Sequence, residues 1–129
     1  MRKWLLVVFL ILLGCYKGYH WFDSPAYFEF LERHKKESWF AGALLKSGLY
    51  WTFADEPRKA LVYFNRCMEK DLEKSPQRSS CLYYKAASHD QLNQRAEAIR
   101  HYSLLFQEFP NHPKASIASR RMDFFKSGL

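Results

Sequence analysis

The sequence predicts an all-α fold. Only five of its 129 residues are glycine and five are proline, too few for the many tight turns of an all-β domain. The stretches between these breakers are long, and small and aromatic residues recur along them at helical spacing. Hydrophobic residues make up 48% of the chain, which is enough for one packed domain and argues against a disordered chain.

The first residues are typical of an export signal. Arg2 and Lys3 precede an uncharged run, WLLVVFLILLG, which extends from Trp4 to Gly14. As a helix, eleven residues rise by roughly 16 Å, against a hydrocarbon core of about 30 Å. We therefore expect residues 1–14 to be a signal peptide rather than a spanning helix.

A lipid attachment site is expected where this run ends. Leu12-Leu13-Gly14-Cys15 resembles the lipobox of bacterial lipoprotein signal peptides, although Leu13 is bulkier than the residue usually found there. The resemblance implies cleavage before Cys15 and attachment of lipid, palmitate included, to its thiol and new amino group. Tyr16 stands where an aspartate would retain an enterobacterial lipoprotein in the inner membrane, which favours the outer membrane. An uncleaved signal anchor and an ordinary secreted protein remain as alternatives.

Six helices are expected after a tether at residues 15–23. The aromatic side chains of this tether would lie either at the headgroup interface or on the first helix. Ser24 and Pro25 are a helix start, with the serine capping free amides, and Asp55-Glu56-Pro57 repeats the signal. The helical domain covers residues 24–129, and its expected helices are 25–36, 38–53, 57–70, 81–92, 95–109 and 114–125.

Small and aromatic residues recur at a fixed spacing in two units. In the second unit Ala86 is followed twelve residues later by Ala98, and then by Tyr102 and Leu105, which share one helix face. The first unit has Gly48, Ala60, Phe64 and Cys67 at the same spacing. A half-unit, Ala26 and Phe30, precedes Ala60 and Phe64 by 34 residues.

A 34-residue period of helix-turn-helix units resembles the tetratricopeptide repeat over roughly residues 25–125. The expected tryptophan is replaced by Leu44 and Leu82, one glycine by Ala86, and the closing proline is present only as Pro110. The second unit is similar to repeats of the barrel-assembly lipoprotein and the Tol-Pal cell-division coordinator of bacterial envelopes. These families hold other proteins, so the resemblance implies a protein-binding scaffold. An unrelated helical bundle is the alternative.

Two further cysteines remain after Cys15. In an oxidising periplasm, an even pair favours a disulfide between Cys67 and Cys81, whose helices would be packed neighbours. Such a bridge would stabilise by about 3 kcal/mol in the chain-entropy model. The alternative is two small apolar core residues.

No catalytic, cofactor or metal motif is found in the sequence. The histidines at positions 20, 34, 89, 101 and 112 show neither HExxH nor close Cys/His pairing, and we interpret them as surface or core residues. There is no GxSxG and no glycine-rich phosphate loop. We therefore expect no enzyme activity, no cofactor and no metal.

The expected function is to bind a partner protein in the cell envelope. In tetratricopeptide repeats the first helix of each unit lines a groove, which suits a peptide segment with apolar anchors. The groove residues here would be Leu45, Leu49, Thr52, Phe53, Tyr83, Ala87, Asp90 and Gln91; the alternative is that the leucines and Phe53 are covered by the half-unit or the tether.

The net charge is +7, which suits an anionic membrane or an acidic partner, whereas export argues against nucleic acid. Arg120, Arg121 and Lys126 form a basic end that touches such a surface or is simply solvated. An anchored structural subunit and an accessory protein of an envelope enzyme are the alternative functions.

Overall fold

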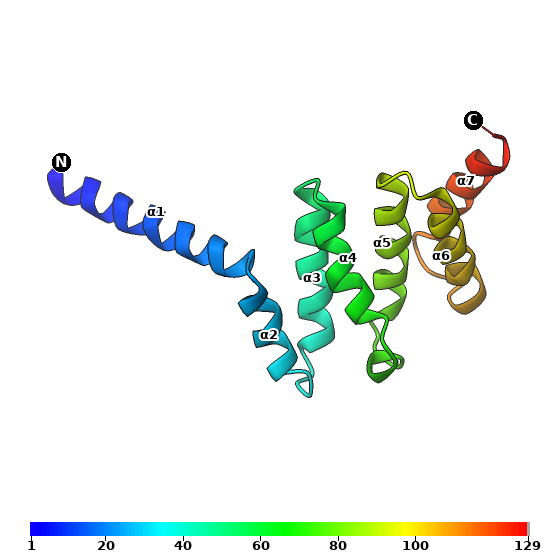
Figure 1. Cartoon of the computed structure of the whole chain (residues 1–129), viewed down its shortest axis with the longest axis horizontal. Coiled ribbons are helices and arrows are strands. Elements are labelled where there is room, and N and C mark those ends of the chain that lie inside the picture. Colours follow the sequence, from blue (N-terminus) through cyan, green and yellow to red (C-terminus); the bar gives the residue numbers. More distant parts are fainter. Residues whose placement is uncertain (129) are drawn as a thin grey trace. The chain divides into compact units, whose positions relative to one another are not determined.

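The structure, a computed structural model, describes residues 1–128 and is entirely helical over that range (Figure 1). The first of two compact units is Met1–Glu37, and the second begins at Ser38. The predicted fold class is confirmed, with six α-helices following the apolar N-terminal one among the described residues. The first unit holds α1 (Arg2–Phe22) and α2 (Pro25–Arg33); the second holds α3 (Phe40–Phe53), α4 (Pro57–Cys67), a 3-10 turn η1 (Lys70–Leu72), α5 (Arg78–Gln91), α6 (Arg95–Glu108) and α7 (Ala115–Lys126).

In the first unit, α1 continues through the lipobox without a break. Residues 15–22, expected as a tether, are the last turns of this helix, and none of its residues is buried. Its aromatic end packs on α2, where the rings of Trp21 and Tyr27 lie 5.1 Å apart and those of Phe22 and Tyr27 lie 4.7 Å apart. Two arrangements were expected for the aromatic side chains of the tether, at the headgroup interface or on the first helix. Trp21 and Phe22 adopt the second, because they pack on α2.

The start of α2 differs from the expected cap. Pro25 occupies the first turn, as predicted, but the Ser24 hydroxyl donates to the carbonyl of Trp21 and makes no capping bond to α2. The prediction that Ser24 caps the amides is therefore wrong, because the Trp21 carbonyl at the end of α1 accepts hydrogen bonds from the Ser24 hydroxyl as well as the Ser24 amide. Ala26 and Phe30, the expected half-unit, are both exposed.

The second unit repeats one helical hairpin with an offset of 38 residues. Helices α3 and α4 form the first hairpin, and α5 and α6 the second (Figure 1). The two turns have the same geometry. Asp55 and Asn93 both have φ of 58°. The amide of the next residue donates to the carbonyl of Trp51 in the first turn and to that of His89 in the second. These are Schellman turns, and Asp and Asn tolerate their left-handed residue better than most side chains do.

The small and aromatic residues of the repeat form the interior of both hairpins. Ala60, Phe64 and Cys67 are fully buried in the first, and Ala98 and Leu105 in the second. The sequence spacing thus predicted the packed face of α4 and α6 correctly. The second hairpin shares a core with α7, formed by Leu82, Tyr83, Ala86, Ala98, Tyr102, Leu105, Ala118 and Phe125.

Candidate functional site

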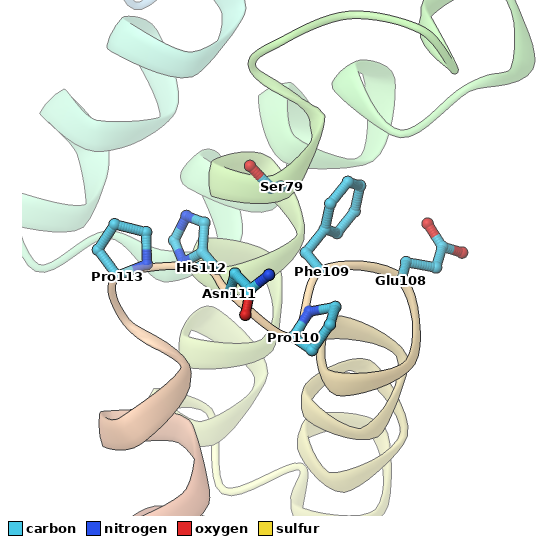
Figure 2. A pocket seen from close by; sticks show the side chains of 7 residues that line it. All are labelled: Ser79, Glu108, Phe109, Pro110, Asn111, His112 and Pro113. Carbon is cyan, nitrogen blue, oxygen red and sulfur yellow. The ribbon is translucent and has the colours of Figure 1, made fainter.

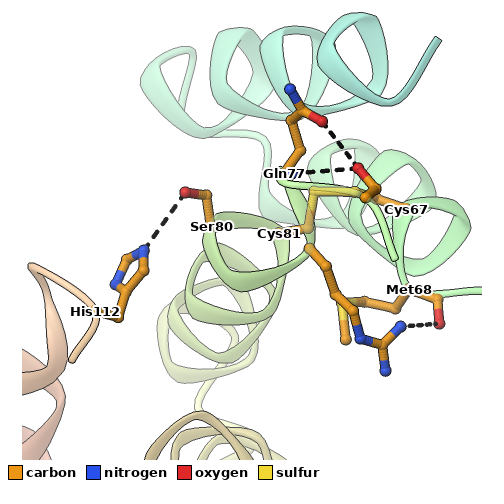
Figure 3. Close-up of a disulfide and its surroundings, with 8 residues drawn as sticks. Cys67, Met68, Gln77, Ser80, Cys81 and His112 are labelled. Atoms are coloured by element: carbon orange, nitrogen blue, oxygen red, sulfur yellow. Dashed lines mark hydrogen bonds between the residues drawn. A yellow bond between two sulfur atoms is a disulfide. The ribbon is translucent and has the colours of Figure 1, made fainter. Parts of the chain in front are cut away.

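The two hairpins are joined covalently between α4 and α5. Cys67 and Cys81 are both fully buried and form a disulfide, with their Cα atoms 6.2 Å apart (Figure 3). Arg78, at the start of α5, donates to the carbonyl of Met68 at the end of α4. The turn between the hairpins is therefore closed by a disulfide and a hydrogen bond at the same point.

A buried arginine orders the same turn from the other side. Both terminal nitrogens of Arg66 donate to the Asp71 carboxylate at 2.9 Å, and Glu69 lies 3.3 Å from the same guanidinium. The guanidinium also lies over the Phe40 ring of α3, 5.1 Å from its centroid. Because a buried arginine needs paired acceptors, we assign Arg66 and Asp71 a structural role.

The expected groove residues fall into two groups with different surroundings. In the first hairpin Leu45, Leu49 and Thr52 are half-buried, and Phe53 is 84% exposed at the end of α3. Three other apolar side chains of the first hairpin, those of Trp39, Tyr50 and Val62, are exposed as well.

The second group is largely occupied by the chain itself. Tyr83 is buried beside Tyr102, and the ring of His112 stacks on it from the segment before α7. The Asp90 carboxylate accepts two hydrogen bonds from Arg121 of α7. Ala87 is half-buried and only Gln91 is exposed. The expected open groove at Tyr83 and Asp90 is therefore corrected: α7 and the segment before it take up these side chains.

The same pair changes the interpretation of the basic C-terminal end. Arg121 is engaged with Asp90, and this hydrogen bond is the main reason that its pKa is raised. Arg120 and Lys126 remain exposed. Of the three basic side chains expected to form this end, Arg120 and Lys126 are thus the two that do not pair with Asp90.

A surface hollow of about 400 Å³ lies where α6 ends (Figure 2). Its wall comes from Ser79 of α5 and from residues 108–113. Beside it, the His112 Nε2 lies 3.5 Å from the Ser80 hydroxyl. A serine and a histidine in contact resemble two parts of a hydrolase site.

The hydrogen bonds argue against that chemistry. The backbone amide of Lys114 donates to Nδ1 of His112, so the proton of the neutral ring is on Nε2, facing Ser80. Burial, then the charge of Lys114, lowers the pKa of His112 and keeps it neutral. Glu108 pairs instead with Arg78, 3.6 Å away. A general base needs its lone pair toward the nucleophile and an acceptor behind it, and His112 has neither.

A different pair of histidines is brought together across the second hairpin. His89 of α5 and His101 of α6 stack with their ring centroids 5.3 Å apart. The sequence motifs gave no reason to pair them. In an antiparallel hairpin, a residue before the turn faces one roughly as far after it, and His89 and His101 lie on either side of the turn at Asn93. Their positions about that turn were the signal that could have paired them.

No protein-family model, curated protein or solved structure matches this chain.

Proposed function

We propose that this protein is a membrane-attached adaptor of the bacterial cell envelope. Its N-terminal segment holds it at the membrane, and its helical hairpins bind another envelope protein. The observation that carries the proposal is the exposure of α1, in which every side chain from Trp4 to Leu13 is at least 40% exposed. An exposed apolar surface of this extent calls for a bilayer, or for removal as a signal.

Attachment through a lipid on Cys15 is the form that we favour. Cys15 is exposed and unbridged, directly after Gly14 and the apolar run. A thiol that emerges at the bilayer surface is accessible to a lipid transferase, and several acyl chains anchor firmly. The outer membrane is the favoured destination because Tyr16 follows the cysteine.

The length of α1 supports the alternative of an uncleaved anchor. The helix has 21 residues and is long and apolar enough to cross a membrane; at 1.5 Å per residue it spans about 31 Å. In that arrangement Lys17 and His20 lie near one end, where they can reach the headgroups. The protein would then be a signal-anchored structural subunit.

The disulfide supports an oxidising compartment. Cys67 and Cys81 are linked and inaccessible to solvent, and such bridges persist in the periplasm but are rare in the cytosol. This agrees with export of the domain by the N-terminal segment.

The binding surface that we propose is the exposed apolar end of α3, where Tyr50 and Phe53 lie three residues apart on one helix face. Its occupant would be an extended or helical segment of another envelope protein that carries apolar anchors. Phe53 is the best candidate for a contact residue because so much of its ring is exposed.

The membrane attachment is tested by the intact mass and first residue of the native protein, beside a Cys15→Ser variant. We expect a chain that starts at Cys15 and carries acyl groups, with both features lost in the variant. A full-length, unacylated chain would exclude the lipoprotein and leave the anchor.

The binding surface is tested by a photo-crosslinking residue at position 53 in cells, with one at Arg120 as the matched control. We expect a discrete crosslinked product only from position 53. In a separate pull-down with the otherwise native chain, Phe53→Ala should abolish capture of the same partner. Equal products from both positions would contradict the proposal. Capture that survives high salt and detergent would favour the structural subunit. Co-purification with a catalytic activity would favour the third function, an accessory protein of an envelope enzyme.

A further inference from the structure

His89, Glu97 and His101 lie together on the second hairpin. Each offers one potential ligand atom, and these three atoms lie within 4.8 Å of one another. Glu97 and His101 are four residues apart on α6, so they share one helix face, and His89 reaches them from α5. Two imidazoles and a carboxylate are a common ligand set for zinc.

The hydrogen bonding of His89 presents the ring as a ligand. Its Nδ1 lies 2.6 Å from the Gln94 side-chain oxygen, which can only accept a hydrogen bond there. The proton of the neutral ring is therefore on Nδ1, and Nε2 carries the free lone pair. A side-chain acceptor behind a histidine, fixing its tautomer, is typical of metal ligands.

His101 would supply the second lone pair through Nε2, from a buried position. The residue is 4% exposed, its Nε2 lies 3.5 Å from a Glu97 oxygen, and its buried Nδ1 has no hydrogen-bond partner. Burial, then the charges of Lys85 and its neighbours, lowers the pKa of His101 to about 4. The ring is therefore neutral at physiological pH, which is the form that binds metal. Nε2 is the ligand atom of the proposal, so metal binding would keep the ring proton on Nδ1, which has no hydrogen-bond partner.

We propose that His89, Glu97 and His101 form a binding site for a divalent transition metal ion of the zinc type. Ligand atoms about 2.1 Å from a tetrahedral metal lie roughly 3.4 Å apart, which the His101–Glu97 pair already matches. The three ligand atoms lie within 4.8 Å of one another, so the His89 side chain has to move closer to complete the set. Three protein ligands leave one coordination position for water or for a side chain of the partner.

The charges around the site set its expected strength and selectivity. Lys85 and Arg100 both act on His101 and oppose a bound cation, and Glu97 is the one carboxylate that offsets them. We therefore expect weaker binding than at a four-ligand structural site. Imidazole nitrogen favours zinc, copper, nickel and cobalt, whereas magnesium and calcium require oxygen ligands.

The test is titration of the full chain, purified in detergent, with Zn²⁺ and with Co²⁺ as a spectroscopic probe. We expect one equivalent to bind, with ligand-field bands of tetrahedral cobalt and no thiolate charge-transfer band. His89→Gln and Glu97→Gln should each weaken binding at least tenfold, and both positions are open enough for the fold to tolerate the change. His34→Gln, in the first unit, is the matched control and should bind as the native chain does. Mg²⁺ should not compete.

Cys15 is present in every variant, so a contribution from its thiol would appear equally in all of them. Binding that is the same in the native chain, His89→Gln and Glu97→Gln would overturn the site. Absence of bound Zn²⁺ at millimolar concentration would overturn it as well. Circular dichroism of each variant shows whether a loss of binding reflects a loss of fold.

Discussion

The two hairpins of the second unit share one backbone plan and differ in what fills it. The first, α3–α4, has Gly48 where the second, α5–α6, has Ala86. A Cβ on Gly48 would lie 2.3 Å from the buried Phe64 ring, so this pair of helices requires glycine. The second hairpin accommodates a methyl group at the same place. The two hairpins therefore share the same turn and helix starts, whereas the packing between the two helices differs from one hairpin to the other.

The hairpins also differ in how each connects to the next element. Cys67 of the first corresponds to Leu105 of the second, and both are fully buried. The first is bridged to α5 by a disulfide, whereas the second reaches α7 through apolar packing and the pair of Asp90 with Arg121. One connection is covalent and depends on redox conditions; the other depends on packing and charge.

Breaking the covalent connection should have the largest effect. Replacing Cys67 and Cys81 together by alanine should lower the free energy of unfolding by about 3 kcal/mol, because the unfolded chain loses a closed loop. Urea unfolding of the double variant measures this, with Cys15→Ala as the control that should leave the midpoint unchanged. An unchanged midpoint in the double variant would mean that packing alone holds the first hairpin to the second.

A pH effect of similar size should come from His101 of the second hairpin, and His112, whose pKa is also lowered, adds to it. The pKa of His101 is about 4 in the folded protein and near 6.5 when unfolded, so between these values the unfolded state binds more protons. Stability is then full above pH 6.5 and falls as the pH drops toward 4, by up to about 3 kcal/mol.

Metal-free protein, unfolded by urea across this pH range, provides the measurement. Lys85, His89, Arg100 and Glu97 all act on His101, so the matched comparison is His101→Gln at the same salt concentration. The variant should lose most of the slope between pH 4 and 6.5. An unchanged slope would place the titrating group elsewhere.

The next largest difference in stability is expected from substitutions at the small residues Gly48 and Ala86, which occupy the same place in the two hairpins. Gly48→Ala should destabilise by about 2 kcal/mol, since overpacking against Phe64 outweighs the better helix propensity of alanine. Ala86→Gly, its counterpart, should cost about 1 kcal/mol through propensity alone. Thermal unfolding compares the two, and Phe64→Leu on the Gly48→Ala background should restore part of the loss. A Gly48→Ala variant more stable than the native chain would refute the close approach.

The smallest effect is expected at α7. The Asp90–Arg121 pair should contribute less than about 1 kcal/mol, because Arg121 is partly exposed and solvent screens the charges. A double-mutant cycle with Asp90→Asn and Arg121→Gln, repeated at high salt, isolates the coupling. A coupling well above 1 kcal/mol would make this pair a main attachment of α7.

Local sequence signals predicted the helices well and the side-chain partners less well. Pro57 marks the start of α4 as expected, and the polar stretch after Cys67 contains the turn before α5. Ser24 was expected to cap α2, and its hydroxyl bonds to Trp21 instead. A start signal reports which backbone groups need partners, but not which of two nearby groups a hydroxyl will choose.

The sequence by itself determined that the chain is helical and that its hairpins repeat. These properties follow from helical periodicity and turn chemistry, which act over a few residues. Only the tertiary structure decided that α7 and the segment before it take up Tyr83 and Asp90. It also decided that His89 and His101 meet beside Glu97. Such contacts depend on how whole helices pack and on which atoms are left without partners, and neither is encoded in the spacing of any one segment.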